Sequence, residues 1–342
     1  MELDRRSFMC LAGVGPAVAL LSGSSVIGDR PAPTDEDDLV GTRVVLIGEY
    51  GYMQKTIRDL PPETTVDARR ALFTVANSRN TAPNALLGCQ IGMRPVNPYP
   101  VVLRDCPDVH FLGGRINGEV PLQSDWAPTY CNSAGLLVKG GTRRPTIEGL
   151  RVRRCWDGVR LTDEAKGFLI KSCWLSEVRD DAVEDDHLLG GVIDDCLLDG
   201  CFSGISLDPA SNARDGSKEV VAIERSLIRM QPYLAKGEVV HQVPVKASDV
   251  SPTLKITDSV FAFSSPKMRG FRRMERTWQR LLESHGNTLL WLPDEPIPAE
   301  LPLPSQGFDV LSGNEAREFW HKARQQWIRA HPDVPRFPDD EL

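Results

Sequence analysis

The chain has 342 residues, 41% hydrophobic and 25% charged, so it can bury a substantial core. Its formal net charge of −7 argues against nucleic acid as a partner, because that binding depends on Lys and Arg neutralising phosphates. The eight cysteines form neither a CxxC pair nor a cysteine–histidine spacing of the zinc-finger kind. The composition therefore favours a globular or solenoid protein.

The first residues predict an export signal. Arg5 and Arg6 precede an apolar run over residues 10–21, which is too short and too rich in glycine for a permanent membrane anchor. The paired arginines, with Phe8 behind them, resemble a twin-arginine signal, and an ordinary secretory signal is the alternative. We expect residues 1–27 to be this signal and the protein to be periplasmic or secreted.

The next segments predict a linker, a strand and a cap. Residues 28–41 combine proline with an acidic run, which is typical of a disordered linker. Residues 42–48 are apolar and β-branched, which favours a first strand. Residues 60–77 begin with two prolines and continue with spaced hydrophobic residues. We expect a short helix there, forming an N-terminal cap over the open end of the fold.

Two further short strands are expected at residues 101–103 and 109–112. A turn-rich insertion over residues 119–133 then interrupts the pattern and carries Trp126. Loops that interrupt a regular scaffold often carry binding residues, and an aromatic ring can stack on a sugar. Trp126 is thus a candidate substrate-binding residue, although the insertion could equally fold around its own hydrophobic side chains.

Three imperfect copies of one unit follow between Thr146 and Asp208. Each copy has a short apolar strand, a cysteine, a pair of small or acidic residues and a second strand. The pairs recur after 24 and then 22 residues: Asp157-Gly158, Asp181-Ala182 and Ser203-Gly204. A period in the twenties, built from strands and turns, predicts an all-β solenoid in which parallel coils stack, a parallel β-helix.

Cysteines stand near the same point of each unit. Cys155, Cys173 and Cys196 are expected to stack as an internal ladder, which Ser226 and Ser259 continue in later units. Buried free cysteines behave as small hydrophobic residues, so we expect this ladder to belong to the core. A disulfide in an oxidising compartment is the alternative.

The solenoid is expected to span residues 42–292, with its last coil at residues 287–292. Residues 293–342 then hold a proline-rich linker and a C-terminal amphipathic helix over residues 312–331, packed on the solenoid. One face of that helix carries large or small apolar residues at helical spacing. These are Ala316, Phe319, Trp320, Ala323 and Trp327.

Adjacent coils of a β-helix lie about 4.8 Å apart, so outward residues at equivalent positions form rows. We take Val159, Val183, Ile205 and Val243 as equivalent inward residues. The outward positions then form an acidic face that begins just before these strands. Its residues are Asp157, Asp180, Asp181 and Ser203, then Arg160, Glu184, Ser206 and Pro244, then Thr162, Asp186, Asp208 and Lys246, with His187 beside Asp186.

This face could carry three kinds of chemistry or none. Carboxylates on neighbouring coils fall at the spacings used for glycoside hydrolysis, and crowding raises the pKa of one of them. Carboxylates at 185, 186 and 208 could instead hold Ca²⁺ for elimination or epimerisation at a uronate, with Lys246 or Arg160 as the base. Asp residues also recur at coil corners simply because they hydrogen-bond their own backbone.

The repeat resembles the right-handed parallel β-helix superfamily of pectin-lyase-like proteins, over roughly residues 42–292. The stretch WDGV at residues 156–159 is similar to the N-T-D-G element of polygalacturonase-type glycoside hydrolases, and RDDAV at residues 179–183 to their G-D-D-C element. The resemblance implies acid and base roles for Asp157, Asp180 and Asp181. Ser203 stands where that family has His, and Pro244 stands where it has the Arg of Arg-Ile-Lys.

We therefore expect an exported, polysaccharide-processing enzyme, either a glycoside hydrolase that needs no cofactor or a Ca²⁺-dependent uronate lyase or epimerase. The alternative is a non-catalytic glycan-binding or structural surface solenoid. The candidate catalytic residues are Asp157, Asp180, Asp181 and Lys246. The candidate substrate-binding residues are Arg160, Glu184, Asp186, His187, Asp208 and Trp126, and the candidate metal ligands of the lyase alternative are Asp185, Asp186 and Asp208.

Overall fold

A computed structural model describes residues 39–40, 43–51, 53–74, 99–123, 125 and 134–340. The expected export signal, most of the expected linker and Trp126 lie outside the described residues. Within the described part of the chain, no helix is both long and apolar enough to cross a membrane.

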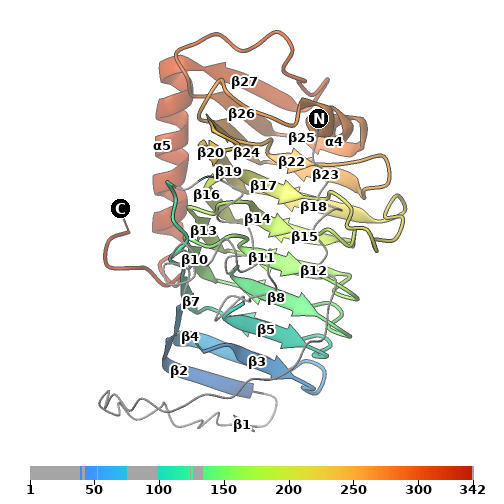
Figure 1. Cartoon of the computed structure of the whole chain (residues 1–342), viewed down its shortest axis with the longest axis vertical. Helices are drawn as coiled ribbons and strands as arrows, with labels where there is room; N and C mark the ends of the chain where they lie inside the picture. Colours follow the sequence, from blue (N-terminus) through green and yellow to red (C-terminus); the bar gives the residue numbers. More distant parts are fainter. Residues whose placement is uncertain are drawn as a thin grey trace, which may run out of the picture.

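The fold is a parallel β-helix, which confirms the all-β solenoid predicted from the repeat (Figure 1). Successive coils contribute strands to three faces. The first face contains β6 (His110–Leu112), β9 (Thr146–Glu148), β12 (Phe168–Lys171), β15 (Gly191–Asp194), β18 (Val220–Glu224), β23 (Thr253–Thr257) and β25 (Leu281–His285). The second contains β7 (Arg115–Asn117), β10 (Arg151–Arg153), β13 (Trp174–Ser176), β16 (Leu197–Cys201), β19 (Leu227–Met230), β24 (Val260–Phe263), β26 (Asn287–Trp291) and β27 (Phe308–Ser312).

The third face carries the residues on which the functional argument depends. It contains β3 (Lys55–Arg58), β5 (Val101–Arg104), β8 (Leu136–Lys139), β11 (Val159–Leu161), β14 (Asp181–Glu184), β17 (Ser203–Ser206) and β22 (Val245–Lys246). The hairpin of β20 (Tyr233–Ala235) and β21 (Glu238–Val240) is inserted between β19 and β22. All seven strands of this face run parallel, so equivalent residues stack from coil to coil.

The prediction of an N-terminal helix within residues 60–77 is wrong, because residues 65–74 form a strand. This strand, β4 (Thr65–Thr74), pairs in parallel with β2 (Arg43–Gly51), and β1 (Leu39–Val40) pairs antiparallel with β2. Fully buried apolar side chains recur at every second position in two short runs, Val66 with Ala68 and Ala71 with Phe73. The Arg69-Arg70 pair between the runs shifts the register and gives the sequence a helix-like spacing.

The corner between the first and second faces has a repeated backbone design. Ser172, Asp195, Arg225 and Asp258 each adopt a left-handed conformation, with φ between 47° and 51°. The following residue turns inward and is small: Cys173, Cys196, Ser226 or Ser259. The hydroxyl oxygens of Ser226 and Ser259 each accept the backbone N–H of the preceding coil's ladder residue, at 3.1 Å. These hydrogen bonds satisfy backbone groups that burial at the corner would otherwise leave unpaired.

One member of the expected cysteine ladder is misplaced. Arg151 pairs with Trp174, so Leu150 is the residue that stacks on Cys173. Cys155 lies after β10, at the far end of the second face, where its carbonyl accepts the N–H of Arg179. The difference arises because the spacing from Cys155 to Cys173 is shorter than a full coil. Cys155, Cys173 and Cys196 are all buried free thiols, as expected for core residues.

The C-terminal helix is confirmed as α5 (Gly313–Ala330), which lies along the second face (Figure 1). Ala316, Trp320 and Trp327 of the expected apolar stripe are buried, whereas Phe319 is 38% exposed. They pack on side chains that point outward from successive strands of that face, namely Trp174, Leu197, Leu227, Val260 and Leu290. The Trp327 indole N–H also donates to Asp195 at the coil corner, at 3.0 Å.

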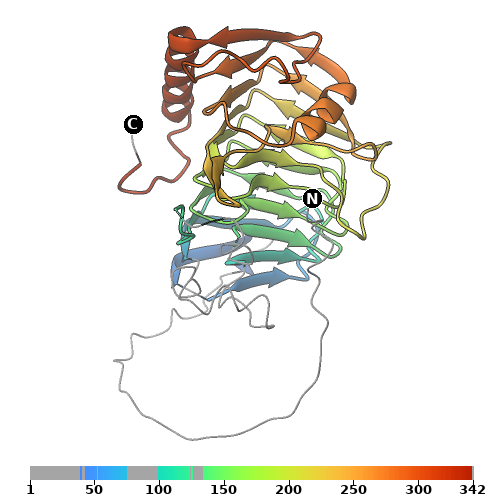
Figure 2. The same ribbon diagram turned by 45° about the horizontal axis from the view of Figure 1, so that its top comes forward.

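The solenoid continues past the expected end at residue 292, because β27 adds a further parallel strand to β26. A helix that the sequence analysis did not anticipate, α4 (Phe271–Gln279), follows β24 and contacts β22 of the third face. Figure 2 shows α4 and α5 on opposite sides of the C-terminal end of the stack. The second face is therefore covered by α5, while α4 covers the end of the third.

Replacing Trp327 by Ala should lower the free energy of unfolding by about 3–5 kcal/mol, because a large buried side chain leaves a cavity between α5 and the second face. Phe319→Ala on the same helix is the matched control, and its effect should stay within about 0.5 kcal/mol because the ring is partly exposed. Urea denaturation of both variants measures the difference. Equal effects would show that α5 does not pack on the solenoid as described.

Candidate active site

The site begins at the N-terminal ends of β11 and β14, where each strand enters the third face. Small residues, Gly158 and Gly204, stand at the close approach between coils: a Cβ on either would lie 2.4 Å from a carbonyl oxygen of the next coil. Ala182, between them, and the following Val183 both belong to the core. Because these two consecutive residues both point inward, the alternation of inward and outward side chains is interrupted at the start of β14. Asp181 and Glu184, on either side of them, therefore both lie on the outer side.

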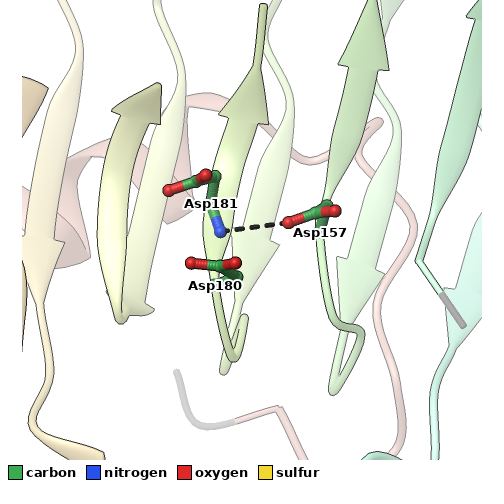
Figure 3. A group of neighbouring side chains, drawn as sticks. All are labelled: Asp157, Asp180 and Asp181. Atoms are coloured by element: carbon green, nitrogen blue, oxygen red, sulfur yellow. Dashed lines mark hydrogen bonds between the residues drawn. The ribbon is translucent and has the colours of Figure 1, made fainter. Parts of the chain in front are cut away.

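Three carboxylates from two adjacent coils meet there (Figure 3). Asp157, Asp180 and Asp181 each place an oxygen within 4.8 Å of the others. None of the three is more than 4% exposed. The Asp181 backbone N–H donates to the Asp157 carboxylate at 3.3 Å, which ties the two coils together. The structure therefore brings together the three carboxylates that the sequence analysis assigned to catalysis.

Donors on the later coils bind the Asp181 carboxylate. The Lys246 ammonium lies 2.6 Å from one Asp181 oxygen and 2.8 Å from the other. The Ser203 hydroxyl, directly beside Asp181 in the strand register, donates a short hydrogen bond to the same carboxylate. Charge-assisted donors of this kind stabilise a buried carboxylate anion.

Asp157 has the opposite environment. Burial raises the pKa of its carboxyl well above the ordinary value of 3.8, and the negative charges of Glu184, Asp180 and Asp181 raise it further. Arg160 acts in the other direction but does not cancel these effects. The environment of Asp157 therefore disfavours its ionised form, whereas Asp181 has a cation and a hydroxyl donor beside it.

A second set of side chains continues outward from the carboxylates. The Arg160 guanidinium donates to Asp186 at 2.7 Å and lies 3.3 Å from Glu184. It also donates to the Tyr99 hydroxyl at 3.2 Å. Tyr99 is close enough to Asp157 and Glu184 for their charges to contribute to the raised pKa of its phenol, although burial is the main cause. The sequence analysis missed Tyr99, and only the stacking of a distant coil brings it here.

The expected register of Lys246 was wrong by two residues. Val245, rather than Val243, pairs with Ile205, so Lys246 stacks beside Ser206. The resulting row on the outer side is Arg160, Glu184, Ser206 and Lys246. The insertion of the β20–β21 hairpin between β19 and β22 hides this register in the sequence. The shift matters because it places the ammonium of Lys246 against Asp181.

Other expected site residues lie apart from the carboxylates. The His187 ring accepts the backbone N–H of Asp163 at 2.8 Å. Asp208 accepts a hydrogen bond from Arg273 of α4 at 3.0 Å. One oxygen of Asp185 accepts the N–H of Leu189 at 3.0 Å, inside the turn after β14.

The metal-ligand set expected for the lyase alternative is not supported. Asp185, Asp186 and Asp208 engage separate partners: a turn, Arg160 and Arg273. Within the described ranges, the acidic group whose oxygens could share an ion is Asp157, Asp180 and Asp181.

Arg179 marks the boundary of the site on the side of the hairpin. Its guanidinium lies 4.7 Å from the Tyr233 ring centre and donates to the Leu234 carbonyl at 3.1 Å. Burial lowers the pKa of this guanidinium, although the Tyr233 and Asp180 charges oppose the shift. Arg179 therefore joins the hairpin to the coil that carries Asp180 and Asp181.

Comparison with protein-family models, with curated proteins and with solved structures finds no match for this chain. The assignment of the site consequently depends on its geometry.

Asp181→Asn should lower the free energy of unfolding by about 3–5 kcal/mol, because it leaves the Lys246 ammonium buried without its counter-ion. Asp157→Asn should instead raise the free energy of unfolding at neutral pH, because ionisation of this buried carboxyl is disfavoured in the folded chain but not in the unfolded one, and an amide does not titrate. Urea denaturation of the two variants at pH 7 tests this asymmetry.

The same pair of variants predicts a pH dependence. A carboxyl whose folded pKa is raised contributes stability below its unfolded pKa, near 3.8, and loses that contribution as pH rises through the folded value. The wild-type chain should therefore lose more stability from pH 5 to pH 8 than Asp157→Asn. Identical slopes would mean that Asp157 is ionised throughout.

Proposed function

We propose that this chain is an exported carbohydrate-active enzyme that hydrolyses glycosidic bonds on the third face of its β-helix. The observation that carries the proposal is the close approach of two carboxyls in opposite environments: Asp157, buried among other carboxyls, and Asp181, paired with Lys246 on a later coil. Glycoside hydrolysis requires one carboxyl that donates a proton and a second that acts as an anion. Two neighbouring carboxyls whose environments shift their pKa values in opposite directions meet this requirement.

The geometry suggests how the reaction would proceed. Asp157 donates its proton to the glycosidic oxygen while the bond from that oxygen to the anomeric carbon breaks. Asp181 attacks the anomeric carbon, and a water deprotonated by Asp157 then displaces it and releases the sugar. One oxygen of each carboxyl lies within 4.8 Å of an oxygen of the other, which is compatible with the separation of about 5 Å used by retaining enzymes. Retention at the anomeric carbon is therefore expected.

The uronate lyase or epimerase alternative is less well supported. It needs Lys246 or Arg160 to remove a proton from a sugar carbon, yet Lys246 is bound to Asp181, and Arg160 to Asp186 and Glu184. Asp157, Asp180 and Asp181 offer the oxygen ligands that Ca²⁺ prefers. A Ca²⁺ ion there would have to share Asp181 with the Lys246 ammonium.

The family relationship of the protein and its cellular location are further parts of the proposal. The WDGV and RDDAV stretches place Asp157, Asp180 and Asp181 together, which supports kinship with polygalacturonase-type hydrolases of the pectin-lyase-like superfamily. Ser203 contacts Asp181 where that family has His, which is a departure. The signal-like residues 1–27 support export by the twin-arginine route to the periplasm or beyond.

One observation favours a non-catalytic glycan-binding or structural solenoid instead. Asp157, Asp180, Asp181, Glu184 and Asp186 are each no more than 6% exposed. The outermost side chain of the cluster is Arg160, at 32% exposure. Because these carboxylates are buried, a sugar could reach them only after covering groups move, whereas a purely structural role would need no such movement.

Reducing-end release from a panel of neutral, aminated and uronate oligosaccharides tests the enzyme proposal. Asp157→Asn should lower kcat at least about 100-fold, the usual contribution of a general acid, with the fold intact. Asp194→Asn is the matched control, because it removes an ion-paired carboxylate on the first face, far from the site. Saturable glycan binding without turnover of any member of the panel would favour the non-catalytic alternative.

A further inference from the structure

The chain continues beyond α5 as a strap, residues 331–340, that lies against the second face. The root of the strap is His331, directly after the last turn of α5. Its far end lies on β10, where the Asp340 carboxylate accepts two hydrogen bonds from the buried Arg151 guanidinium, at 2.5 and 3.0 Å. Phe337 is also buried, with its ring centre 5.1 Å from the central carbon of that guanidinium. The strap is therefore a packed part of the fold.

The His331 ring has an acceptor at each of its two nitrogens. Nε2 lies 2.8 Å from Oδ2 of Asp195 at the coil corner, and Nδ1 lies 2.8 Å from the carbonyl oxygen of Trp327 on α5. A neutral imidazole carries one N–H and can donate to only one of these oxygens, whereas an imidazolium ion donates to both. The geometry therefore matches the protonated ring.

Two further features of the setting favour a positive charge on this ring. The ring stacks on the Trp327 indole, with ring centres 4.0 Å apart and planes inclined by 16°, and the face of an aromatic ring attracts a cation. The ring also lies at the C-terminal end of α5, where the carbonyl groups of the last turn give a partial negative charge. The His331 side chain is 15% exposed, so water screens these interactions only in part.

Asp195 supplies the charge that acts on this ring. Cations on the adjoining elements have carboxylate partners of their own, namely Arg225 with Asp194 and Arg324 with Asp199. The first carboxyl of the strap, Asp333, acts on Arg69 of β4. Burial lowers the pKa of the His331 ring, but the hydrogen bonds to Asp195 and Trp327 and the Asp195 charge outweigh it, so the pKa lies above its ordinary value of 6.5.

We propose that His331 is a proton-dependent latch, which holds the root of the strap on the second face while the ring is charged and loosens it when the ring loses its proton. Loss of the proton removes one of the two hydrogen bonds of the ring and its attraction to Asp195. The stability that the charged ring contributes is complete below pH 6.5 and is lost as the pH rises through the raised folded value. This device is independent of the hydrolase proposed above.

Histidine side-chain NMR of the intact chain tests whether the ring holds its proton. The resonances of His331 are identified by their absence in His331→Gln, and they should titrate with a pKa above 6.5. Asp195→Asn should lower this pKa, because it replaces the carboxylate by a neutral amide whose oxygen can still accept the Trp327 indole N–H. A pKa at or below 6.5 in the wild-type chain would overturn the latch, whatever the stability of the variants.

Hydrogen exchange of the intact chain, followed by mass spectrometry, tests whether the proton holds the strap. After correction for the pH dependence of chemical exchange, protection of residues 331–334 should fall at least about fivefold from pH 6 to pH 9, because a charged ring at a helix C-terminus contributes about that much. The backbone N–H groups of His331 and Val334 report it, since they bind the carbonyls of residues 327 and 331.

Two histidine variants on the same part of the chain complete the experiment. His331→Gln should show the lower protection at both pH values, whereas His321→Gln, which replaces an exposed histidine of α5, should behave as the wild type does. Constant protection in the wild-type chain, or the same fall in wild type and His331→Gln, would overturn the proposal. A fall that His321→Gln abolishes would also overturn it, because the titrating group would then lie elsewhere on the helix.

Discussion

Stacking of coils in register is the constraint on which the rest of this structure depends. Each strand of the third face hydrogen-bonds to its equivalent on the next coil, so the backbones of neighbouring coils stay about 4.8 Å apart and equivalent side chains start from adjacent points. Apolar residues at equivalent positions therefore build one continuous core. The same constraint forces Asp157 to lie beside Asp181.

The site follows from the electrostatic cost of that enforced proximity. Like charges held together in a shielded place raise one another's pKa unless counter-charges are near. Burial and the neighbouring carboxylates raise the pKa of Asp157, whereas Asp181 has the ammonium of Lys246 and the hydroxyl of Ser203 beside it. A scaffold that fixes backbone positions so strongly can hold such a strained arrangement, and this is the physical basis of the proposed acid–base pair.

The predictions from sequence succeeded where the repeat is regular. The period, the ladder of Cys173, Cys196, Ser226 and Ser259, and the stripe on α5 all follow from short-range patterns. They failed where the pattern is ambiguous or interrupted. The spacing of apolar residues in β4 also fits a helix, Cys155 lies off the ladder by less than one coil, and the β20–β21 hairpin hides the register of Lys246.

The sequence by itself determined the solenoid and the three carboxylates near its coil corners, because a fixed repeat of small, acidic and apolar residues encodes both. Only the tertiary structure decided which side chains meet those carboxylates. Lys246 and Tyr99 are 65 and 58 residues from Asp181 and Asp157, and α4 removes Asp208 from the group by pairing it with Arg273. Contacts at such separations depend on how many residues each coil holds, and loops of variable length leave that number undefined until the coils have stacked.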